Sequence, residues 1–409
     1  MERNRKNPSV VILTSVIPPR LHLMLGSVIR YAQEHGPWRL YQAERRLWSY
    51  NFKNWKKWGA DAIISADHHT LEEARQIAAA KLPTVVLLQP HQMRARGYPL
   101  RKFSCCLWDS AAIGKMAARH FLDRGYSNFA FVDDPLKETY WSQDRERAFR
   151  RELRESLPDG FGYFRYGGAT VCERRDWMNE RPRLAKWLRD LPKPCAVFAP
   201  NDRRGKQVLD ACAEEGVSVP SDLAVLGVDD DPWICESSVP TLSSIRCDVE
   251  SAGYAIAEHL DRLIRGKHPR RVEIPVKPIG ITTRQSTDWM SVRDDRVSKT
   301  LTFIHRNFQD PSLSVRQLAL NAGIARRTLE LRFRKATGKT LREEIEHVRL
   351  SHAKTLLRKS TSKISETAKA CGYASAIHFS SIFTKRFGIS PVKFRNHPQA
   401  RNTFPPRRP

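Results

Sequence analysis

Short apolar segments alternate with longer amphipathic segments along residues 8–283, and this alternation constrains the fold more than any other feature of the chain. Several of the short segments are uninterrupted by polar residues, as is typical of strands buried on both faces of a sheet. Strand–helix alternation of this length indicates parallel sheets covered by helices, and the region is long enough for two lobes. The predicted strands are 10–14, 62–65, 84–88, 103–107, 128–132, 161–166, 196–199, 224–228 and 271–276.

The chain is predicted to contain two folded units. We expect an α/β unit at 8–285, a polar linker at 286–295, an all-helical unit at 296–396 and a basic, proline-rich tail at 397–409, which is expected to fray. The fold class is therefore a two-lobed α/β domain, with helices on both faces of parallel sheets, followed by an all-α domain. The predicted helices of the first unit are 20–34, 71–80, 110–124, 142–153, 202–214 and 249–265.

Positive charge is concentrated in the C-terminal region. Residues 290–409 hold 25 Lys and Arg against 8 Asp and Glu, a net charge of +17 out of the +26 of the whole chain. Such a concentration favours a polyanionic partner for this region, the alternative being a merely solubilising surface.

The cysteines and the apolar segments bear on the compartment. Eight cysteines stand at 105, 106, 172, 195, 212, 235, 247 and 371, and none forms a Cys-x-x-Cys pair. We expect reduced, buried thiols, no metal site and no cofactor. No apolar segment approaches the roughly 18 residues of a membrane helix, and no cleavage site follows the apolar run at 10–13. A cytoplasmic protein without a membrane partner is predicted.

The C-terminal region contains an internal repeat. One copy has Gly323, Leu329, Phe333 and Gly338, and the other has Gly372, Phe379, Phe383 and Gly388 at a spacing of 49 or 50 residues. Each copy is predicted to be a helix, a tight turn at the first glycine and a second helix with one apolar face. This layout is that of a helix-turn-helix whose second helix enters the major groove of DNA.

The predicted reading helices carry different outward residues. In the first copy Ser314 caps helix 315–321, and the second helix covers 325–336. In the second copy Ser365 opens helix 366–370, and the second helix covers 375–386. A helix at 341–359, about 30 Å long, would separate the two units by nearly the spacing of adjacent major grooves, about 34 Å. A helical bundle that binds protein is the alternative. The candidate DNA-binding residues are Ser314, Arg326, Arg327, Glu330, Arg334, Ser375, Ala376, Ile377, His378 and Ser381.

These residues resemble the AraC-type DNA-binding domain. The first half of that domain is matched by Ser314-Val315, Leu318-Ala319, Gly323 and Thr337-Gly338, and the second half by Gly372-Tyr373, His378-Phe379 and Gly388-Ile389-Ser390-Pro391. The resemblance covers about residues 295–395. It implies sequence-specific control of transcription, usually activation, with reading positions at Arg326, Arg327, Glu330, Ala376, Ile377 and His378. The apolar pair Ala376–Ile377 departs from the polar residues that many members have there.

Polar side chains follow several predicted strands of the α/β unit. Because ligands bind at the carboxyl ends of parallel strands, these side chains are candidates for binding the hydroxyl groups of a small molecule. An aromatic ring such as that of Trp141 can stack on a sugar. Each Asn or Asp at a helix start is, taken alone, more often a helix cap than a ligand contact. The candidates are Asp109, Trp141, Arg145, Asn201, Asp202, Asp229 and Asp231.

The same region resembles the LacI/GalR-type sugar-binding domain. The matching segments include Arg124-Gly125-Tyr126, Ser142 with Arg145, Asn201-Asp202, Gly227-Val228-Asp229 and Ser243-Ser244-Ile245. This resemblance implies a small sugar bound mainly by Arg145, Asn201 and Asp229, and a homodimer. Members normally carry an N-terminal DNA-binding segment, for which the seven residues before Pro8 leave no room, so the AraC-type unit is expected to take its place. This order of units resembles a family of bacterial operon regulators responsive to a pentose, which implies xylose.

The predicted function is that of a sugar-responsive transcription regulator in the cytoplasm, associated with the nucleoid. Its partners are operator or promoter DNA, a sugar, a second copy of the chain and, as a further candidate, RNA polymerase. The alternative is a cytosolic sugar-binding protein whose C-terminal helices bind protein. No enzyme and no catalytic residue is expected, because the usual nucleophile, phosphate-loop and metal-spacing motifs are missing from the sequence. The sugar, the operator, the controlled genes, the sign of the response and the oligomer geometry stay open.

Overall fold

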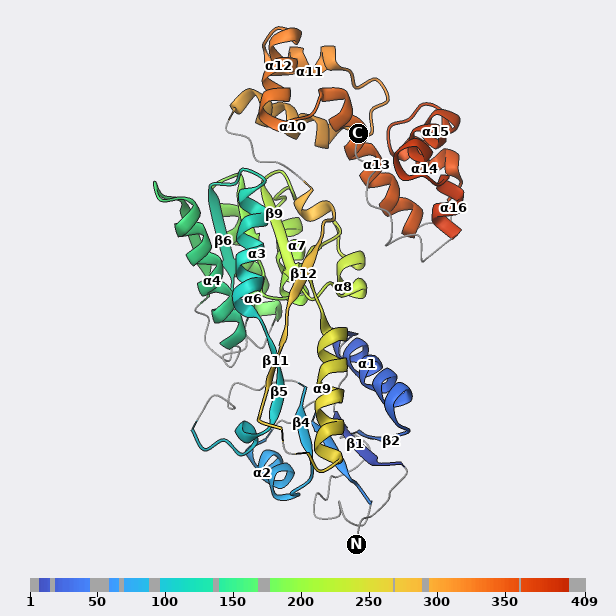
Figure 1. The fold of residues 1–409 in the computed structure, drawn as a ribbon. Coiled ribbons are helices and arrows are strands. Elements are labelled where there is room, and N and C mark those ends of the chain that lie inside the picture. Colours follow the sequence, from blue (N-terminus) through green and yellow to red (C-terminus); the bar gives the residue numbers. More distant parts are fainter. Residues whose placement is uncertain are drawn as a thin grey trace.

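The computed structural model shows two α/β lobes and a helical unit (Figure 1), which confirms the predicted fold class. Among the described residues no helix is long and apolar enough to cross a membrane. The structure describes residues 7–14, 19–44, 59–65, 70–87, 96–134, 140–167, 177–267, 269–288, 294–359 and 362–396. The predicted tail at 397–409 lies outside the described residues, as does Cys172, whereas the other seven cysteines are free and buried.

The first lobe is built on a parallel sheet with strand order β11-β5-β4-β3-β1-β2. Alternate residues of β1 point to opposite faces, as the pleat of a strand requires. Val10 and Ile12 pack in the core that also contains residues of α1 and α9, whereas Val11 and Leu13 pack with residues of α2. The elements are β1 Ser9–Thr14, α1 Pro19–His35, β2 Arg39–Glu44, β3 Ala62–Ser65, α2 Leu71–Ala79, β4 Thr84–Val86, β5 Ser104–Trp108, α9 Val249–Ile264 and β11 Glu273–Val276.

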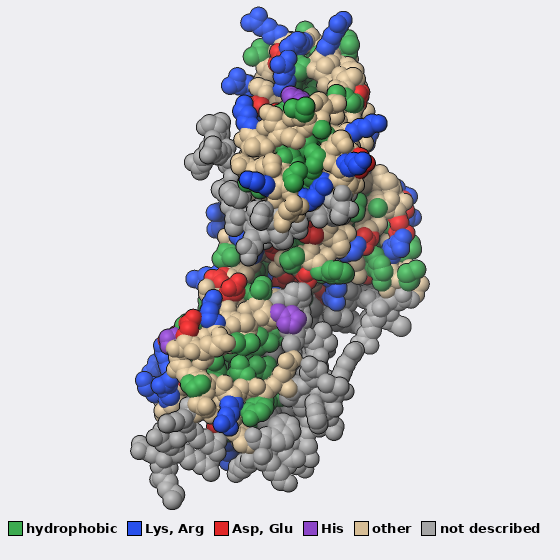
Figure 2. All heavy atoms as spheres, turned by 90° about the vertical axis from the view of Figure 1, so that its right-hand side faces the viewer, with side chains coloured by type: hydrophobic (Ala, Val, Ile, Leu, Met, Phe, Trp, Pro, Cys, Tyr) green, Lys and Arg blue, Asp and Glu red, His purple; other side chains and the backbone are tan. Residues whose placement is uncertain are grey.

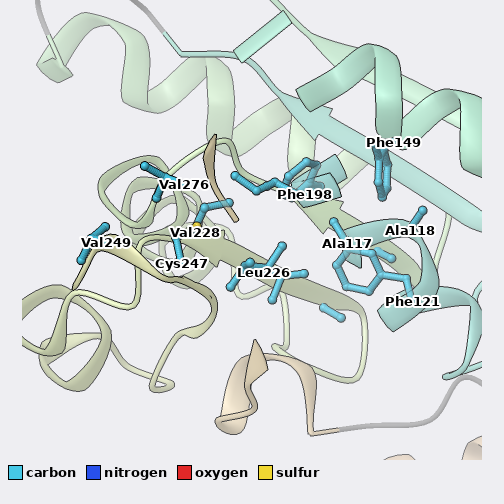
Figure 3. Packing of buried hydrophobic residues seen from close by; sticks show 14 of the residues in the cluster. Ala117, Ala118, Phe121, Phe149, Phe198, Leu226, Val228, Cys247, Val249 and Val276 are labelled. Carbon is cyan, nitrogen blue, oxygen red and sulfur yellow. The ribbon is translucent and has the colours of Figure 1, made fainter. Parts of the chain in front are cut away.

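The second lobe has strand order β12-β10-β9-β8-β6-β7, in which β12 runs antiparallel to β10. Phe198 of β8 and Phe149 of α4 pack together on one face of this sheet, with Phe121 of α3 against Phe149 (Figure 3). The elements are α3 Ser110–Leu122, β6 Asn128–Val132, α4 Tyr140–Ser156, β7 Gly162–Tyr166, α6 Trp177–Asp190, β8 Cys195–Phe198, α7 Asp202–Glu214, β9 Leu223–Val228, α8 Pro232–Ser237, β10 Ser243–Cys247 and β12 Pro278–Thr282.

The structure contains elements that the sequence did not predict. Strands β2, β10 and β12 were missed because they lack a continuous apolar run: β2 is mostly polar, β10 carries two serines and an arginine, and β12 contains proline and glycine. Helix α6 was missed and contains Pro182. The predicted strands and helices otherwise occur within a few residues of the expected bounds.

The chain passes between the lobes in crossings that lie side by side. Asp109 follows β5, Asp248 follows β10, and Lys277 separates β11 from β12. The amide of Asp109 donates a hydrogen bond to the carbonyl of Val276 at 3.0 Å, and the amide of Asp248 donates one to the carbonyl of Lys277 at 2.8 Å. These bonds tie the crossings together, so that the carboxyl ends of strands from both lobes face one interlobe region.

The helical unit contains both predicted helix-turn-helix copies. The turn glycines Gly323 and Gly372 have φ of +64° and +76°, a left-handed conformation that favours glycine. The predicted helix at 341–359 has the observed bounds, but Ser365 does not open the second copy, because that helix already begins at Ile364. The elements are α10 Asp295–Asn307, α11 Val315–Ala322, α12 Arg326–Thr337, α13 Leu341–Lys359, α14 Ile364–Ala370, α15 Ala376–Phe387 and α16 Pro391–Asn396.

Helix α13 joins the two helix-turn-helix copies, because one of its faces packs against each copy. Leu341 and Ile345 lie in the core of the first copy, whereas Leu350 and Ala353 lie in the core of the second. Leu341 and Leu350 are nine residues apart, about two and a half helical turns, so their side chains point to opposite sides. Arg349 reinforces the link, since its guanidinium donates to the carbonyl oxygens of Phe308 and Asp310 at 2.8 and 2.7 Å.

The segment between the α/β lobes and the helical unit is partly folded onto the second lobe. The short 3-10 helix Gln285–Thr287 follows β12, and Ser286 and Thr287, the first residues of the predicted linker, are fully buried. A hydrogen bond to the second lobe stabilises this buried position, since the Ser286 hydroxyl donates to the carbonyl of Val225 in β9 at 2.6 Å.

Candidate ligand cleft and nucleic-acid interface

A cavity of about 770 Å³ lies between the lobes, where the carboxyl ends of β8, β9 and β10 face helices α1 and α9. Its volume suits a small organic ligand. Charged side chains predominate among the described residues that line it, and Trp141 supplies an aromatic ring. They include Arg20, Arg30, Trp141, Asn201, Asp202, Arg203, Asp229, Asp231, Arg246 and Asp248.

An ion pair crosses the cleft. Arg20, in the first turn of α1, pairs with the Asp229 carboxylate, which follows β9 in the other lobe. The Arg20 guanidinium also lies 5.8 Å from the centre of the Trp108 ring. Asp229 and Asp230 have φ of +111° and +53°, so the backbone here adopts a conformation that is uncommon for residues other than glycine. This strained turn aims the Asp229 carboxylate at the opposite lobe.

Arg145 of α4 is buried beside this pair, behind Trp141, and is not among the described residues that line the cavity. Its guanidinium stacks on the Trp141 ring at 4.9 Å and donates to the carbonyl of Pro200. Burial lowers the pKa of Arg145, and the nearby Asp229 carboxylate opposes that shift. Within the described part of the chain, the buried Nε–H groups of Arg20 and Arg145 have no hydrogen-bond acceptor. Because an unpaired buried donor is costly, these groups fit a bound ligand that supplies oxygen acceptors.

Asn201 and Asp202 reach the cleft, but their polar atoms are engaged by the protein. Asn201 caps α7 by accepting from the Arg204 amide at 2.8 Å, and its amide group donates to Asp134 at 2.9 Å. The fully buried Asp202 accepts from the Ser244 hydroxyl at 2.5 Å and from the Asp231 amide at 2.8 Å. Burial, reinforced by Asp229, raises the pKa of Asp202 well above its usual value. Asp202 therefore holds the Asp229–Asp231 turn in shape.

The two remaining candidates for ligand binding are Asp109 and Asp231. Asp109 stands in a crossing between the lobes and caps α3 by accepting from the Ala112 amide at 2.9 Å; it is not among the residues that line the cleft. Its role in ligand binding stays a prediction. Asp231 lines the rim and caps α8 by accepting from the Trp233 amide at 3.0 Å.

Four arginines of the cleft are not among the predicted ligand-binding residues. Arg20, Arg30, Arg203 and Arg246 line it alongside the predicted residues. Arg246 belongs to β10, a strand that was not predicted. Arg20 lies about 209 residues from its partner Asp229, and no local pattern reveals such a pair. The available signal was the position of Arg20 just after the first predicted strand, where ligand-binding side chains are common.

In the helical unit, α12 exposes a cationic face. Leu329 and Phe333 are fully buried, while Arg327 and Arg334 are exposed on the opposite side. Arg326 forms an ion pair with Glu330 at 3.0 Å. Ser314 accepts from the Gln317 amide at 3.4 Å and so caps α11, as predicted. Figure 2 shows Lys and Arg side chains spread over the face of this unit.

The second reading helix, α15, exposes an apolar and a hydroxyl side chain near its start, whereas its exposed cations Lys385 and Arg386 lie in its last turn. Ile377 is 84% exposed, and His378 and Ser381 are also exposed. Ala376 is partly buried against the core of its copy, so only part of this predicted surface faces outward. Ser375 caps the helix by accepting from the His378 amide at 3.4 Å.

One exposed residue of α12 was missed. Leu331 is 65% exposed and lies four residues after Arg327 on the outer face, between that residue and Arg334. The sequence offered a signal, because an apolar residue outside the spacing of Leu329 and Phe333 must point away from the core.

Comparisons with known proteins agree with this geometry. A periplasmic binding protein-like domain matches residues 118–287, and a helix-turn-helix domain matches residues 318–397. The xylose operon regulatory protein of Haemophilus influenzae is 31% identical over 336 residues, covering 82% of this chain and 84% of that protein. Its counterpart in Escherichia coli K12 is 30% identical over 342 residues, covering 83% and 85%.

A solved structure, described as the xylose-binding transcription activator XylR, has a TM-score of 0.71 and 26% sequence identity. The match covers 96% of this chain and 98% of that chain, so both the lobes and the helical unit are shared. The two predicted resemblances are confirmed by these matches. With this likeness along most of its length, the chain belongs to the family of the xylose operon regulatory proteins.

Proposed function

We propose that this sugar-sensing, DNA-binding transcription regulator responds to D-xylose, which binds in the cleft between its lobes. The relatives named for xylose support the choice of sugar. The observation that carries the proposal is the grouping of the Asp229 carboxylate with the unpaired Nε–H groups of Arg20 and Arg145. A carboxylate accepts from sugar hydroxyls and the two Nε–H groups donate to sugar oxygens, so the cleft offers both kinds of partner to a polyol.

The other residues of the cleft take supporting roles in this proposal. The Trp141 ring, backed by Arg145, stacks on the apolar face of the sugar. Asn201 and Asp231 also line the cleft, and the side-chain oxygen of each retains a lone pair beyond its capping bond. Asp202 acts through the Asp229–Asp231 turn that it holds. A neutral sugar replaces no charge in the cleft, and so the Arg20–Asp229 pair persists in the complex.

The helical unit reads DNA in two adjacent major grooves. Arg327 and Arg334 contact guanine edges or phosphates, and the ion pair between Arg326 and Glu330 orients both side chains along α12. In α15, Ile377 contacts a thymine methyl group, while His378 and Ser381 donate to base edges, with Ala376 at the start of the helix. The capping residues Ser314 and Ser375 lie where helix N-termini approach phosphates.

Further features belong to the same proposal. The chain acts in the cytoplasm, near the nucleoid, as a homodimer that binds paired half-sites and contacts RNA polymerase at the promoter, and it catalyses no reaction. The chain divides into units at 8–285, 286–295, 296–396 and 397–409, and the linker begins with two residues, Ser286 and Thr287, that hydrogen-bond to the second lobe. A protein-binding role for the C-terminal helices is less favoured, because a helix-turn-helix domain matches them.

The test is a thermal-shift screen of pentoses and hexoses on the full chain. A ligand that binds only the folded state stabilises it by about 2.7 kcal/mol at a concentration 100 times its dissociation constant, so D-xylose should raise the melting temperature by several degrees. Asp229→Ala should abolish that rise and leave DNA binding in the absence of sugar unchanged. A melting temperature that no sugar moves would contradict the proposal.

A further inference from the structure

One carboxylate connects the sugar-binding lobes to the helical unit. Asp288 directly follows the 3-10 helix at the end of the lobes, and its Oδ1 faces His347 Nε2 of α13 at 2.9 Å. Its other oxygen accepts from the Ser351 hydroxyl, one turn further along the same helix, at 3.1 Å. Helix α13 joins both helix-turn-helix copies through its opposite faces. Asp288 therefore hydrogen-bonds to the helix that packs against both helix-turn-helix copies.

The electrostatics favour an ionised pair at this contact. Burial by itself would raise the pKa of Asp288, but the hydrogen bond and charge of His347 outweigh it and lower that pKa. The pKa of His347 is raised by Asp288 in spite of burial. Other charged groups facing the pair are Arg124, in the turn after α3, His305 of α10, and Lys339 and Glu344, which bond to each other at 2.9 Å.

The residues before Asp288 are held firmly by the second lobe. The Thr287 carbonyl accepts from Arg124 Nε at 2.9 Å, and the Thr287 hydroxyl bonds to His120 at 2.9 Å and to Ser243 at 2.8 Å. The Ser286 amide donates to the carbonyl of Thr241 at 3.0 Å. Because the backbone just before Asp288 is fixed to the second lobe, Asp288 moves with that lobe, and its contact with His347 passes the movement to α13.

The residues that lead to Asp288 also contact the cleft, through an ion pair and a hydrogen bond made by Arg284 and Thr282. Asp230, the neighbour of Asp229, pairs with Arg284 at 2.7 Å and accepts from the Thr282 hydroxyl at 2.6 Å. Arg284 pairs in addition with Glu236 of α8 at 2.8 Å. Only three residues separate Arg284 from Asp288. A short set of charged contacts thus leads from the turn that carries Asp229 to the helix that carries the reading units.

We infer that Arg284 and Asp288 are positioning residues for the DNA response: they couple occupancy of the cleft at Asp229 to the placement of α13 through the Asp288–His347 contact. The inference rests on the proposed sugar response. A ligand shifts an equilibrium between two arrangements only if it favours one of them. Sugar bound at Asp229 favours one setting of the Asp229–Asp230 turn, and the second lobe, bonded to that turn through Arg284, carries Asp288 and its contact with α13 along with it.

The test compares full-length variants in two assays. Xylose binding is measured by thermal shift, and DNA affinity is measured with and without xylose on a duplex selected from a random library by the wild-type protein. Asp288→Asn and His347→Gln should bind xylose as the wild type does. Their xylose-induced change in DNA affinity should shrink by about 2- to 30-fold, the range expected for residues that carry coupling between sites.

Matched variants distinguish a positioning role of these residues from a general loss of folded structure. The double variant Asp288→Asn with His347→Gln should respond like either single variant, because both remove one contact. Asp288→Glu should restore part of the response. Glu346→Gln removes a carboxylate from the exposed side of α13, next to His347, and should respond normally. Arg284→Met should lose the response while Asp288 and His347 remain.

Three outcomes overturn the inference and can be told apart. If Asp288→Asn keeps the full xylose effect on DNA affinity, the contact does not couple the sites, although the proposed function stands. If the wild-type protein itself shows no xylose effect in either assay, the proposed function fails and the inference fails with it. Additive losses in the double variant would also contradict it, because they would assign the two residues to separate contacts.

Discussion

Arg20 of α1 pairs with Asp229 at the end of β9 and so joins the two lobes across the cleft, although 209 residues separate them in the chain. The pair orients the carboxylate toward the cavity and leaves the Arg20 Nε–H without an acceptor among the described residues. Arg20 is the best residue for testing the cleft, because one substitution can remove its unpaired Nε–H donor and keep the positive charge that pairs with Asp229.

Arg20→Lys should weaken xylose binding by about 10-fold, because lysine keeps the ion pair but places no N–H donor at the position of the arginine Nε. Calorimetric titration of the full chain measures the change. Arg30→Lys is the control: Arg30 also lines the cleft, but its guanidinium stacks on Tyr254 at 5.6 Å, and its replacement should change affinity little. Equal losses in both variants would contradict the assignment.

Arg327→Ala should weaken binding to the selected duplex by about 1–3 kcal/mol and relax the base preference at one position, because Arg327 lies on the outward face of α12. Arg332→Ala removes a cation from the same helix near its inward side, where it faces Asp294 at 3.6 Å, and should alter affinity less. Competition binding with single-base variants of the duplex is the measurement. An unchanged base preference would remove Arg327 from the reading set.

Ile377→Ser should reduce the preference for thymine at one position of the second half of the site, since the exposed methyl groups of Ile377 would no longer contact the thymine methyl. The free energy of unfolding should change by no more than about 0.5 kcal/mol, because the side chain is exposed in the free protein. Repeating the selection with the variant checks the first expectation and urea unfolding checks the second. A selected sequence identical to that of the wild type would contradict the contact.

Gly372→Ala should destabilise the helical unit by about 1–3 kcal/mol, because residue 372 has φ of +76° and an added Cβ would lie 2.2 Å from the carbonyl oxygen of Phe308. Gly338→Ala is the matched control. Its φ of +72° imposes a similar backbone strain, but nothing lies within 4 Å of the added Cβ, so the cost should be smaller. Thermal unfolding of both variants decides, and equal destabilisation would show that the contact with Phe308 costs nothing.

The amino-acid sequence determined most of the local structure and both resemblances. Buried strands appear as continuous apolar segments, and the repeat of Gly323 and Gly372 appears as a helix-turn-helix, because residue preferences and helical spacing act over a few neighbours. Helix α13 has the predicted bounds for the same reason. Strands such as β2 and β12 have weak local signals, and their pairing with a neighbouring strand places them in a sheet.

The tertiary structure alone decided which polar groups face the cleft. The sequence grouped Asp202 with Asp229, but folding buries Asp202 against Ser244 and leaves Asp229 facing Arg20 of the other lobe. The contact of Asp288 with His347 likewise joins residues 59 apart. Such contacts depend on how the lobes and helices pack, and side chains compete for partners that come from distant segments. A pattern read along the chain therefore names the candidates, and the packed structure determines which of them keep a free oxygen or nitrogen for a ligand.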